Sequence, residues 1–116
     1  MKIHIRERNV EVTEVLRSHV QRRVGLALGR FGERIGRVIV RFSEIDGLRS
    51  SVDKRCQIEV GLRQRNVQVE DMNADLFTAV DHAADRVSRS VARALERQRD
   101  WGLNPIHPWT SGGSRS

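Results

Sequence analysis

The chain has 116 residues, the length of one domain with a modest hydrophobic core. It carries 21 Lys and Arg residues against 15 Asp and Glu, and this net charge of +6 favours a polyanionic partner, either a nucleic acid or an anionic membrane. The single cysteine excludes an internal disulfide, and no apolar run approaches the roughly 20 residues that span a bilayer, so we expect a small cytoplasmic domain.

The N-terminal part of the chain predicts a strand followed by a helix. Residues 2–6 alternate between apolar and polar side chains, as a half-buried strand does. Thr13 is a suitable N-cap for a helix with apolar residues at every third or fourth position, and Gly32 is its expected stop. Two glycines inside this helix, Gly25 and Gly29, indicate either close approach to a packed neighbour or a kinked last turn.

The middle of the chain predicts three more strands. Each has apolar residues on one face, and they cover residues 37–44, 54–62 and 66–70. We expect a loop at 45–53 and a turn at 70–74. Cys56 falls on an apolar face, which predicts a small buried side chain rather than an activated thiol.

A second amphipathic helix completes the domain. Asp75 is its expected N-cap, and it should run to about Arg99. The order β-α-β-β-β-α predicts an α+β two-layer sandwich, in which a four-stranded sheet carries both helices on one face. The other sheet face would be open to solvent or form a platform for a partner. We assign residues 1–100 to this domain and 101–116, which hold both prolines, to a C-terminal tail without its own core.

The second helix carries its arginines on one side. Arg86, Arg89, Arg93 and Arg97 follow each other at spacings of three and four residues, which places them within an arc of roughly 80°. Such a row on a basic domain is the pattern expected for contacts with phosphate groups, although an ordinary solvated helix face has the same pattern. If the helices lie side by side, one continuous basic surface could also include residues of the first helix: Arg17, Arg22, Arg23 and Arg30.

Catalysis and metal binding find little support in the sequence, and we expect no cofactor. The four histidines lack metal-ligand spacing, and no nucleophile elbow, phosphate-binding glycine loop or HExxH motif is present. A possible ligand set or acid–base pair lies on part of one helix face: Asp81, His82 and Asp85. Such residues usually pair with arginines instead, and Asp85 could pair with Arg89. Aromatic residues make up only 4% of the chain, which disfavours base stacking. It favours contacts with phosphates and recognition of the shape of the nucleic acid.

Two segments carry a resemblance to a known family. The first is NVEVTEVLR at Asn9–Arg17, and the second is DLFTAVD at Asp75–Asp81, followed by Asp85-Arg86-Val87-x-Arg89. They resemble the N-terminal motif, the D-[ML]-Y-x-A-I-D motif and the D-K-L-x-R-Q motif of the hibernation promoting factor and ribosome-associated inhibitor family, historically called sigma-54 modulation proteins. The resemblance covers about residues 1–99, and Phe77 stands where the family usually has Tyr.

The resemblance implies a non-enzymatic protein that binds the small ribosomal subunit, occupies the channel for mRNA and tRNAs and blocks translation in stationary phase or stress. It implies that basic side chains contact rRNA phosphates. By matching position, Arg86, Arg89 and Arg93 take the place of the family's basic residues in the second helix. Two other interpretations stay open: a structured-RNA-binding module with a different target, and a protein–protein regulator of the kind that the sigma-factor name suggests.

Overall fold

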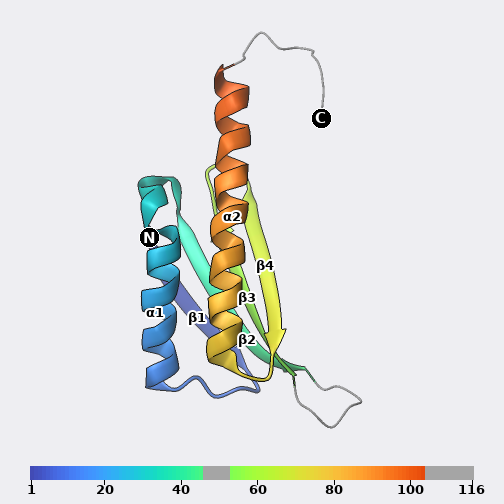
Figure 1. Cartoon of the computed structure of the whole chain (residues 1–116). Coiled ribbons are helices and arrows are strands. Elements are labelled where there is room, and N and C mark those ends of the chain that lie inside the picture. Colours follow the sequence, from blue (N-terminus) through green and yellow to red (C-terminus); the bar gives the residue numbers. More distant parts are fainter. Residues whose placement is uncertain (46–52, 104–116) are drawn as a thin grey trace.

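The elements follow each other in the predicted order. The structure is a computed structural model that describes residues 1–45 and 53–103. Most of the predicted loop, residues 46–52, and most of the predicted tail therefore lie outside the described residues. The elements are β1 (Lys2–Arg8), α1 (Glu14–Leu28), a 3-10 helix η1 (Gly29–Arg34), β2 (Arg37–Ile45), β3 (Asp53–Gly61), β4 (Asn66–Asn73) and α2 (Leu76–Leu103) (Figure 1).

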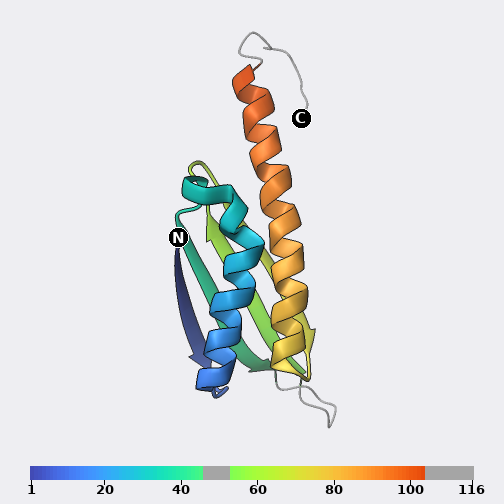
Figure 2. The same ribbon diagram turned by 60° about the vertical axis from the view of Figure 1, so that its left-hand side comes forward.

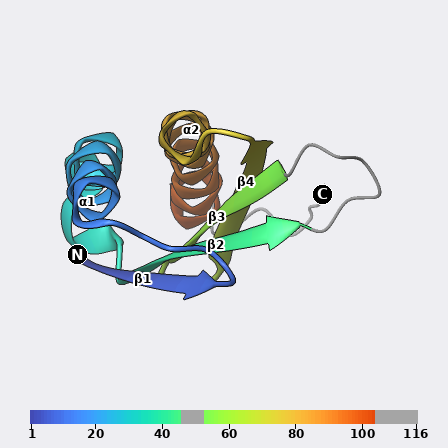
Figure 3. The ribbon, with the colours of Figure 1, turned by 90° about the horizontal axis from the view of Figure 1, so that it is seen from below.

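The strands form one mixed sheet in the order β1-β2-β3-β4. β1 pairs with β2 in parallel across the α1 connection, and β2–β3 and β3–β4 are antiparallel. The two helices lie side by side (Figure 2) and cover the same face of the sheet (Figure 3). The predicted α+β two-layer sandwich is therefore confirmed, and no element among the described residues covers the opposite face.

The core fills the space between the helices and the sheet. The strands contribute every second residue, and the helices contribute one stripe each, because the periods of the two elements bring those side chains to one face. The side chains with no exposed surface include Val20, Val24, Leu28, Val38, Val40, Cys56, Ile58, Val60, Val80, Val87 and Val91. The inward-facing residues predicted for the strands and helices thus form one continuous core.

Both predicted N-caps are present. The Thr13 hydroxyl accepts a hydrogen bond from the backbone N–H of Leu16 at 3.2 Å. The Asp75 carboxylate accepts from the backbone N–H of Phe77 at 3.0 Å and from the hydroxyl of Thr78 at 2.9 Å. These side chains satisfy N–H groups that have no partner inside the helix, and so they fix where each helix begins.

The first helix is followed by a kink, and its glycines make no close contact. A Cβ atom at Gly25 or Gly29 would meet no atom within 4 Å, so close approach to a neighbour does not explain them. The chain tightens after Leu28 into η1. Gly32 takes φ 58° and ψ −131°, a conformation that residues with a Cβ atom rarely adopt. The kinked last turn is therefore the interpretation that the structure supports.

β4 is longer than predicted. The turn expected at 70–74 is wrong, because the strand continues to Asn73 in register with β3. Asp71 pairs with Cys56 across the two strands and is only 8% exposed, on the face covered by the helices. Acidic and amide residues are typical of turns, and here one of them occupies an inward-facing strand position instead.

α2 also exceeds its predicted length. It continues to Leu103, beyond the end expected near Arg99. Its C-terminal turns project past the sheet and past α1 (Figures 1 and 2). None of the described helices combines the length and the apolar character that a membrane crossing requires.

Candidate nucleic-acid interface

Three exposed arginines form a row along α2. Arg89, Arg93 and Arg97 follow each other at intervals of four residues, so each is displaced from the last by about 6 Å along the helix axis. All are exposed, and none forms an ion pair with a described residue. We call these three residues the α2 row. Its guanidinium groups are available to an external anion.

The fourth arginine predicted for this row, Arg86, is bound to the sheet. It donates a hydrogen bond to the backbone carbonyl of Glu70 at 2.6 Å, and its Nη2 atom lies 3.4 Å from the Asp71 carboxylate. The Nδ1 atom of His82 lies 3.2 Å from the other oxygen of Asp71. Because a carboxylate buried to this degree needs polar partners, Arg86 and His82 anchor α2 against β4.

Ion pairs also connect the two helices. Arg23 of α1 contacts Asp85 at 3.0 Å and Asp81 at 3.3 Å, and the Nε2 atom of His19 lies 2.8 Å from Asp81. The predicted pairing of Asp85 with Arg89 is wrong, because Asp85 turns toward α1. The surface between the helices is therefore ion-paired, and it interrupts the continuous basic surface that the sequence suggested.

The group Asp81, His82 and Asp85 does not form a metal or acid–base site. The two aspartates face α1, whereas His82 faces Asp71 on β4. Across residues 1–45 and 53–103, the structure contains no group of three or more His, Cys, Asp or Glu side chains that could hold a metal ion. The roles of these residues are those of ion pairs between elements.

The remaining candidates on α1 and η1 differ in their surroundings. Arg30 donates to the hydroxyl of Ser88 at 3.2 Å, and its guanidinium carbon lies 4.6 Å from the centre of the Phe31 ring. Arg22 is exposed and Arg17 partly exposed, and neither has an ion-pair partner in the described part of the chain. The eight predicted residues thus form two groups. Arg23, Arg30 and Arg86 contact other elements, whereas Arg17, Arg22 and the α2 row have no ion-pair partner among the described residues.

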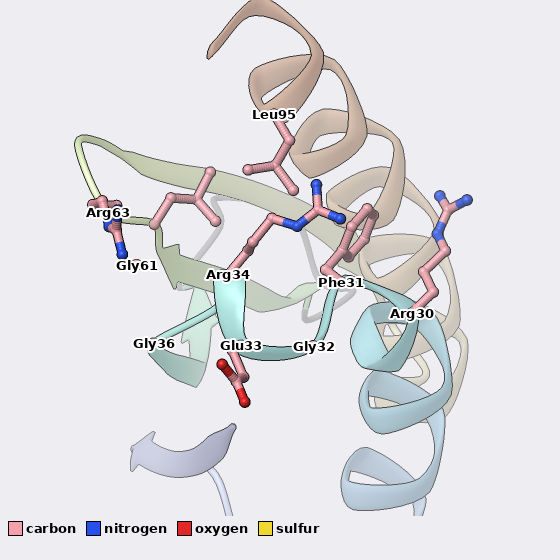
Figure 4. Close-up of a pocket in the computed structure, with 10 residues that line it drawn as sticks. Arg30, Phe31, Gly32, Glu33, Arg34, Gly36, Gly61, Arg63 and Leu95 are labelled. Atoms are coloured by element: carbon pink, nitrogen blue, oxygen red, sulfur yellow. The ribbon is translucent and has the colours of Figure 1, made fainter. Parts of the chain in front are cut away.

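A cavity of about 820 Å³ opens where η1, the β3–β4 connection and α2 meet (Figure 4). The Arg34 side chain points into it beside Phe31 and Leu95, whereas Glu33 points away from the helices. The described residues that line it include no His, Cys, Ser or Lys. It therefore offers charge and apolar surface, but no pair of groups for nucleophilic or acid–base catalysis.

Cys56 is a buried thiol. Burial, and secondarily the negative charge of Asp71, raises the pKa of Cys56 to about 12. A thiol with this pKa carries almost no thiolate at neutral pH and is a poor nucleophile. The prediction of a small buried side chain is confirmed.

The sequence reasoning did not identify Asp71, which organises the contact between α2 and β4. A signal was present: Val67, Val69 and Asp71 occupy alternate positions, so the carboxylate shares the inward face of the two valines. A charged residue at such a position indicates a partner on the packed helix.

The fold and this surface define a small basic α+β domain with a row of exposed arginines along its second helix. Residues 3–99 match the family described as Sigma 54 modulation protein / S30EA ribosomal protein. The chain belongs to this family, as its two motifs indicated.

Curated relatives carry ribosome-related names. The ribosome hibernation promotion factor of Lactococcus lactis subsp. cremoris is 27% identical over 108 residues, which are 91% of this chain and 56% of that protein. The chloroplastic ribosome-binding factor PSRP1 of Spinacia oleracea is 26% identical over 105 residues, 88% of this chain and 35% of that protein. The ribosome hibernation promoting factor of Pseudomonas putida is 29% identical over 99 residues, 85% of this chain and 91% of that protein. The chain thus spans about half the length of the Lactococcus lactis protein and about a third of the Spinacia oleracea protein.

Two solved structures share the fold. The N-terminal domain of Thermus thermophilus Protein Y has a TM-score of 0.65 and 30% identity, with 80% of this chain and 98% of that chain covered. A ribosomal subunit interface protein from Coxiella burnetii has a TM-score of 0.68 and 83% and 99% coverage, and at 17% identity it supports the fold alone.

Proposed function

We propose that the protein is a ribosome hibernation factor without enzymatic activity. It binds the small ribosomal subunit in the cytoplasm through rRNA phosphates, and it blocks the channel for mRNA and tRNAs in stationary phase or stress. Membership of the Sigma 54 modulation protein / S30EA family and the names of the relatives support the ribosome as partner. The observation that carries the binding surface is the α2 row, Arg89, Arg93 and Arg97.

The α2 row suits a phosphate backbone. Like charges four residues apart destabilise a helix by a few tenths of a kcal/mol per pair, and no acidic partner among the described residues offsets this cost. Arginine binds phosphate with a planar, forked set of donors, and each contact releases counterions from the nucleic acid. The α2 row therefore gains the most binding free energy from a line of phosphate groups.

The mode of action that we propose is occlusion. Phe31 and Phe42 are buried, so these rings are not available for stacking on bases. Contacts through phosphates and shape require no base to be read, and a folded domain that fills a channel excludes other ligands without a chemical step. Bound mRNA and tRNA should therefore compete with the protein for the small subunit.

Co-sedimentation with purified small subunits tests this proposal. We expect binding that weakens steeply between about 50 and 200 mM salt. The variant Arg89→Glu/Arg93→Glu should lose most of this binding, and the slope of log K against log salt should fall by about 1.5 for two lost phosphate contacts. Arg86 is left unchanged, because a glutamate there would face the buried Asp71 and disturb the fold.

The matched control is Arg63→Glu/Arg65→Glu, which changes the net charge equally at the exposed turn between β3 and β4. It should bind like the wild type. Absence of wild-type binding at low salt would overturn the proposed function. Unchanged binding of Arg89→Glu/Arg93→Glu would overturn the α2 row as its surface. Equal affinity for unrelated structured RNA would instead favour a general RNA-binding module, and capture of one protein partner would favour a regulator.

A further inference from the structure

The sheet face opposite the helices carries a second group of cations. Lys2, Arg6 and Arg8 of β1 and Arg37 of β2 are exposed on this face, and none has an ion-pair partner among the residues that the structure describes. The parallel register places Lys2 beside Arg37 and Arg6 beside Arg41. We call this half of the face the β1–β2 surface. It lies on the opposite layer from the α2 row (Figure 3).

The other half of the same face is neutralised. Glu59 of β3 contacts Arg41 at 3.1 Å, and Glu70 of β4 lies 3.6 Å from Arg55. Arg55 also donates to the hydroxyl of Ser43, at 3.4 Å. The face is therefore divided, with its described carboxylates on β3 and β4 and its unpaired cations on β1 and at the start of β2.

The cross-strand pairing of cations needs an explanation outside the fold. Like charges directly opposite each other on neighbouring strands are destabilising, and Lys2 beside Arg37 is such a pair. Features that cost stability without a structural gain are expected at functional sites. An external anion would remove the repulsion.

An apolar residue is covered on this face. Ile39 lies on the uncovered side of the sheet, yet it is only 9% exposed. Its neighbours on this face are Arg37 and Arg41 along the strand, with His4 and Glu59 beside it in the register. The stems of longer side chains such as Arg37 and Arg41 can cover an apolar neighbour while their charged ends stay in water.

The far end of the same surface is hollowed. A depression of about 490 Å³ lies at the end of β1 and is lined by Arg6, Arg8, Arg41 and Arg55 together with Phe42, polar residues and two glutamates. Arg41 and Arg55 already pair with Glu59 and Glu70, whereas Arg6 and Arg8 have no ion-pair partner among the described residues. Arg6 and Arg8 are therefore the groups that an anion entering from the open face would meet.

We propose that the β1–β2 surface is a second RNA-binding surface, which takes the phosphate backbone of an RNA segment distinct from the one at the α2 row. Alternate residues of a strand lie about 6.6 Å apart, close to the separation of neighbouring phosphates along an RNA strand. Residues 2–8 of β1 and 37–44 of β2 present no exposed large apolar side chain, so this part of the surface lacks the apolar anchors that a protein partner would use. The domain would then stand between two RNA segments, a placement that rests on the proposed function.

The test compares three double variants of the full chain for binding to purified small subunits. They are Arg6→Glu/Arg37→Glu on the sheet, Arg89→Glu/Arg93→Glu on α2, and the control Arg63→Glu/Arg65→Glu. We expect the sheet variant to weaken binding and to lower the slope of log K against log salt by about 1.5 relative to the wild type. This loss and the loss caused by the α2 variant should be independent and add to each other. Nucleotide footprinting should show that the sheet and α2 variants lose protection at different rRNA positions.

A second sheet variant, Arg6→Gln/Arg37→Gln, keeps the test independent of folding. It removes like charges and keeps part of each side-chain stem, so its melting temperature should not fall, while its salt slope should still decrease. If the sheet variants bind like the wild type while the α2 variant does not, the inference is overturned and the proposed function stands. Loss of a protein partner with intact RNA binding would also overturn it. If the wild type fails to bind, the proposed function itself fails.

Discussion

Alkaline unfolding of this protein should depend mainly on one thiol. Cys56 has no exposed surface, and burial raises its pKa from the ordinary value of 9.0 to about 12, with a smaller contribution from the charge of Asp71. The chain has no Tyr, and its lysines are Lys2 and Lys54, so few other side chains release protons in this range. Ionisation of Cys56 is therefore the main event that opposes folding between pH 9 and 12.

The size of the effect follows from the two pKa values. Because the pKa of Cys56 is higher in the folded protein than in the unfolded chain, the unfolded chain loses its proton first. The contribution of the Cys56 thiol to the free energy of unfolding is complete below pH 9 and is lost as the pH rises toward 12. The difference between 9.0 and about 12 corresponds to about 4 kcal/mol, a large part of the roughly 5–15 kcal/mol that stabilises a domain.

Urea unfolding followed by far-UV circular dichroism measures this loss. The wild type and Cys56→Ala are compared at several pH values from 8 to 11. At pH 8 the variant should be less stable by about 1 kcal/mol or more, because a buried group is removed. Above pH 9 the wild type should lose stability steeply and the variant much less. Parallel curves for the two proteins would refute the reasoning, as would rapid reaction of the native thiol with a thiol reagent at pH 8.

Two further predictions concern the fold. Gly32→Ala should lower the free energy of unfolding by about 1–3 kcal/mol, because φ at this residue is +58°. Gly25→Ala should raise the free energy of unfolding by up to about 1 kcal/mol, since its Cβ would meet no atom within 4 Å. Urea unfolding measures both, and equal effects of the two variants would contradict the kink. Asp71→Ala should cost about 1–3 kcal/mol, because Arg86 and His82 lose their shared carboxylate, and a cost near zero would show that this contact does not hold α2 on β4.

Much of the fold could be predicted because its elements differ in period. Alternation of side chains identified the strands, and the three-to-four spacing identified both helices, so the face that each element buries was known in advance. The caps Thr13 and Asp75 carry their own local signal. The length of β4 could not be predicted in this way, since an acidic residue such as Asp71 at an inward position becomes favourable only when α2 brings Arg86 and His82 next to it.

The candidate site shows the same limit. The sequence identified the arginines of the second helix, because their spacing places them on one side. It could not separate Arg86 from the α2 row, since a helical period gives a direction around the axis and not the identity of the element that packs there. Asp85 lies four residues before Arg89 and yet pairs with Arg23 of α1. Which cations remain free is decided by tertiary contacts.

The distribution of acidic side chains explains why a modest net charge leaves groups of unpaired cations among the described residues. Asp71 is used between α2 and β4, Asp81 and Asp85 between the helices, and Glu59 and Glu70 within the sheet. Carboxylates that neutralise cations at these contacts cannot also screen the α2 row or the β1–β2 surface. Composition alone allowed a membrane as the partner. A helix that lies on a membrane needs an exposed apolar face. Residues 76–97 of α2 present no exposed large apolar side chain, which favours RNA phosphates as the ligand of its arginines.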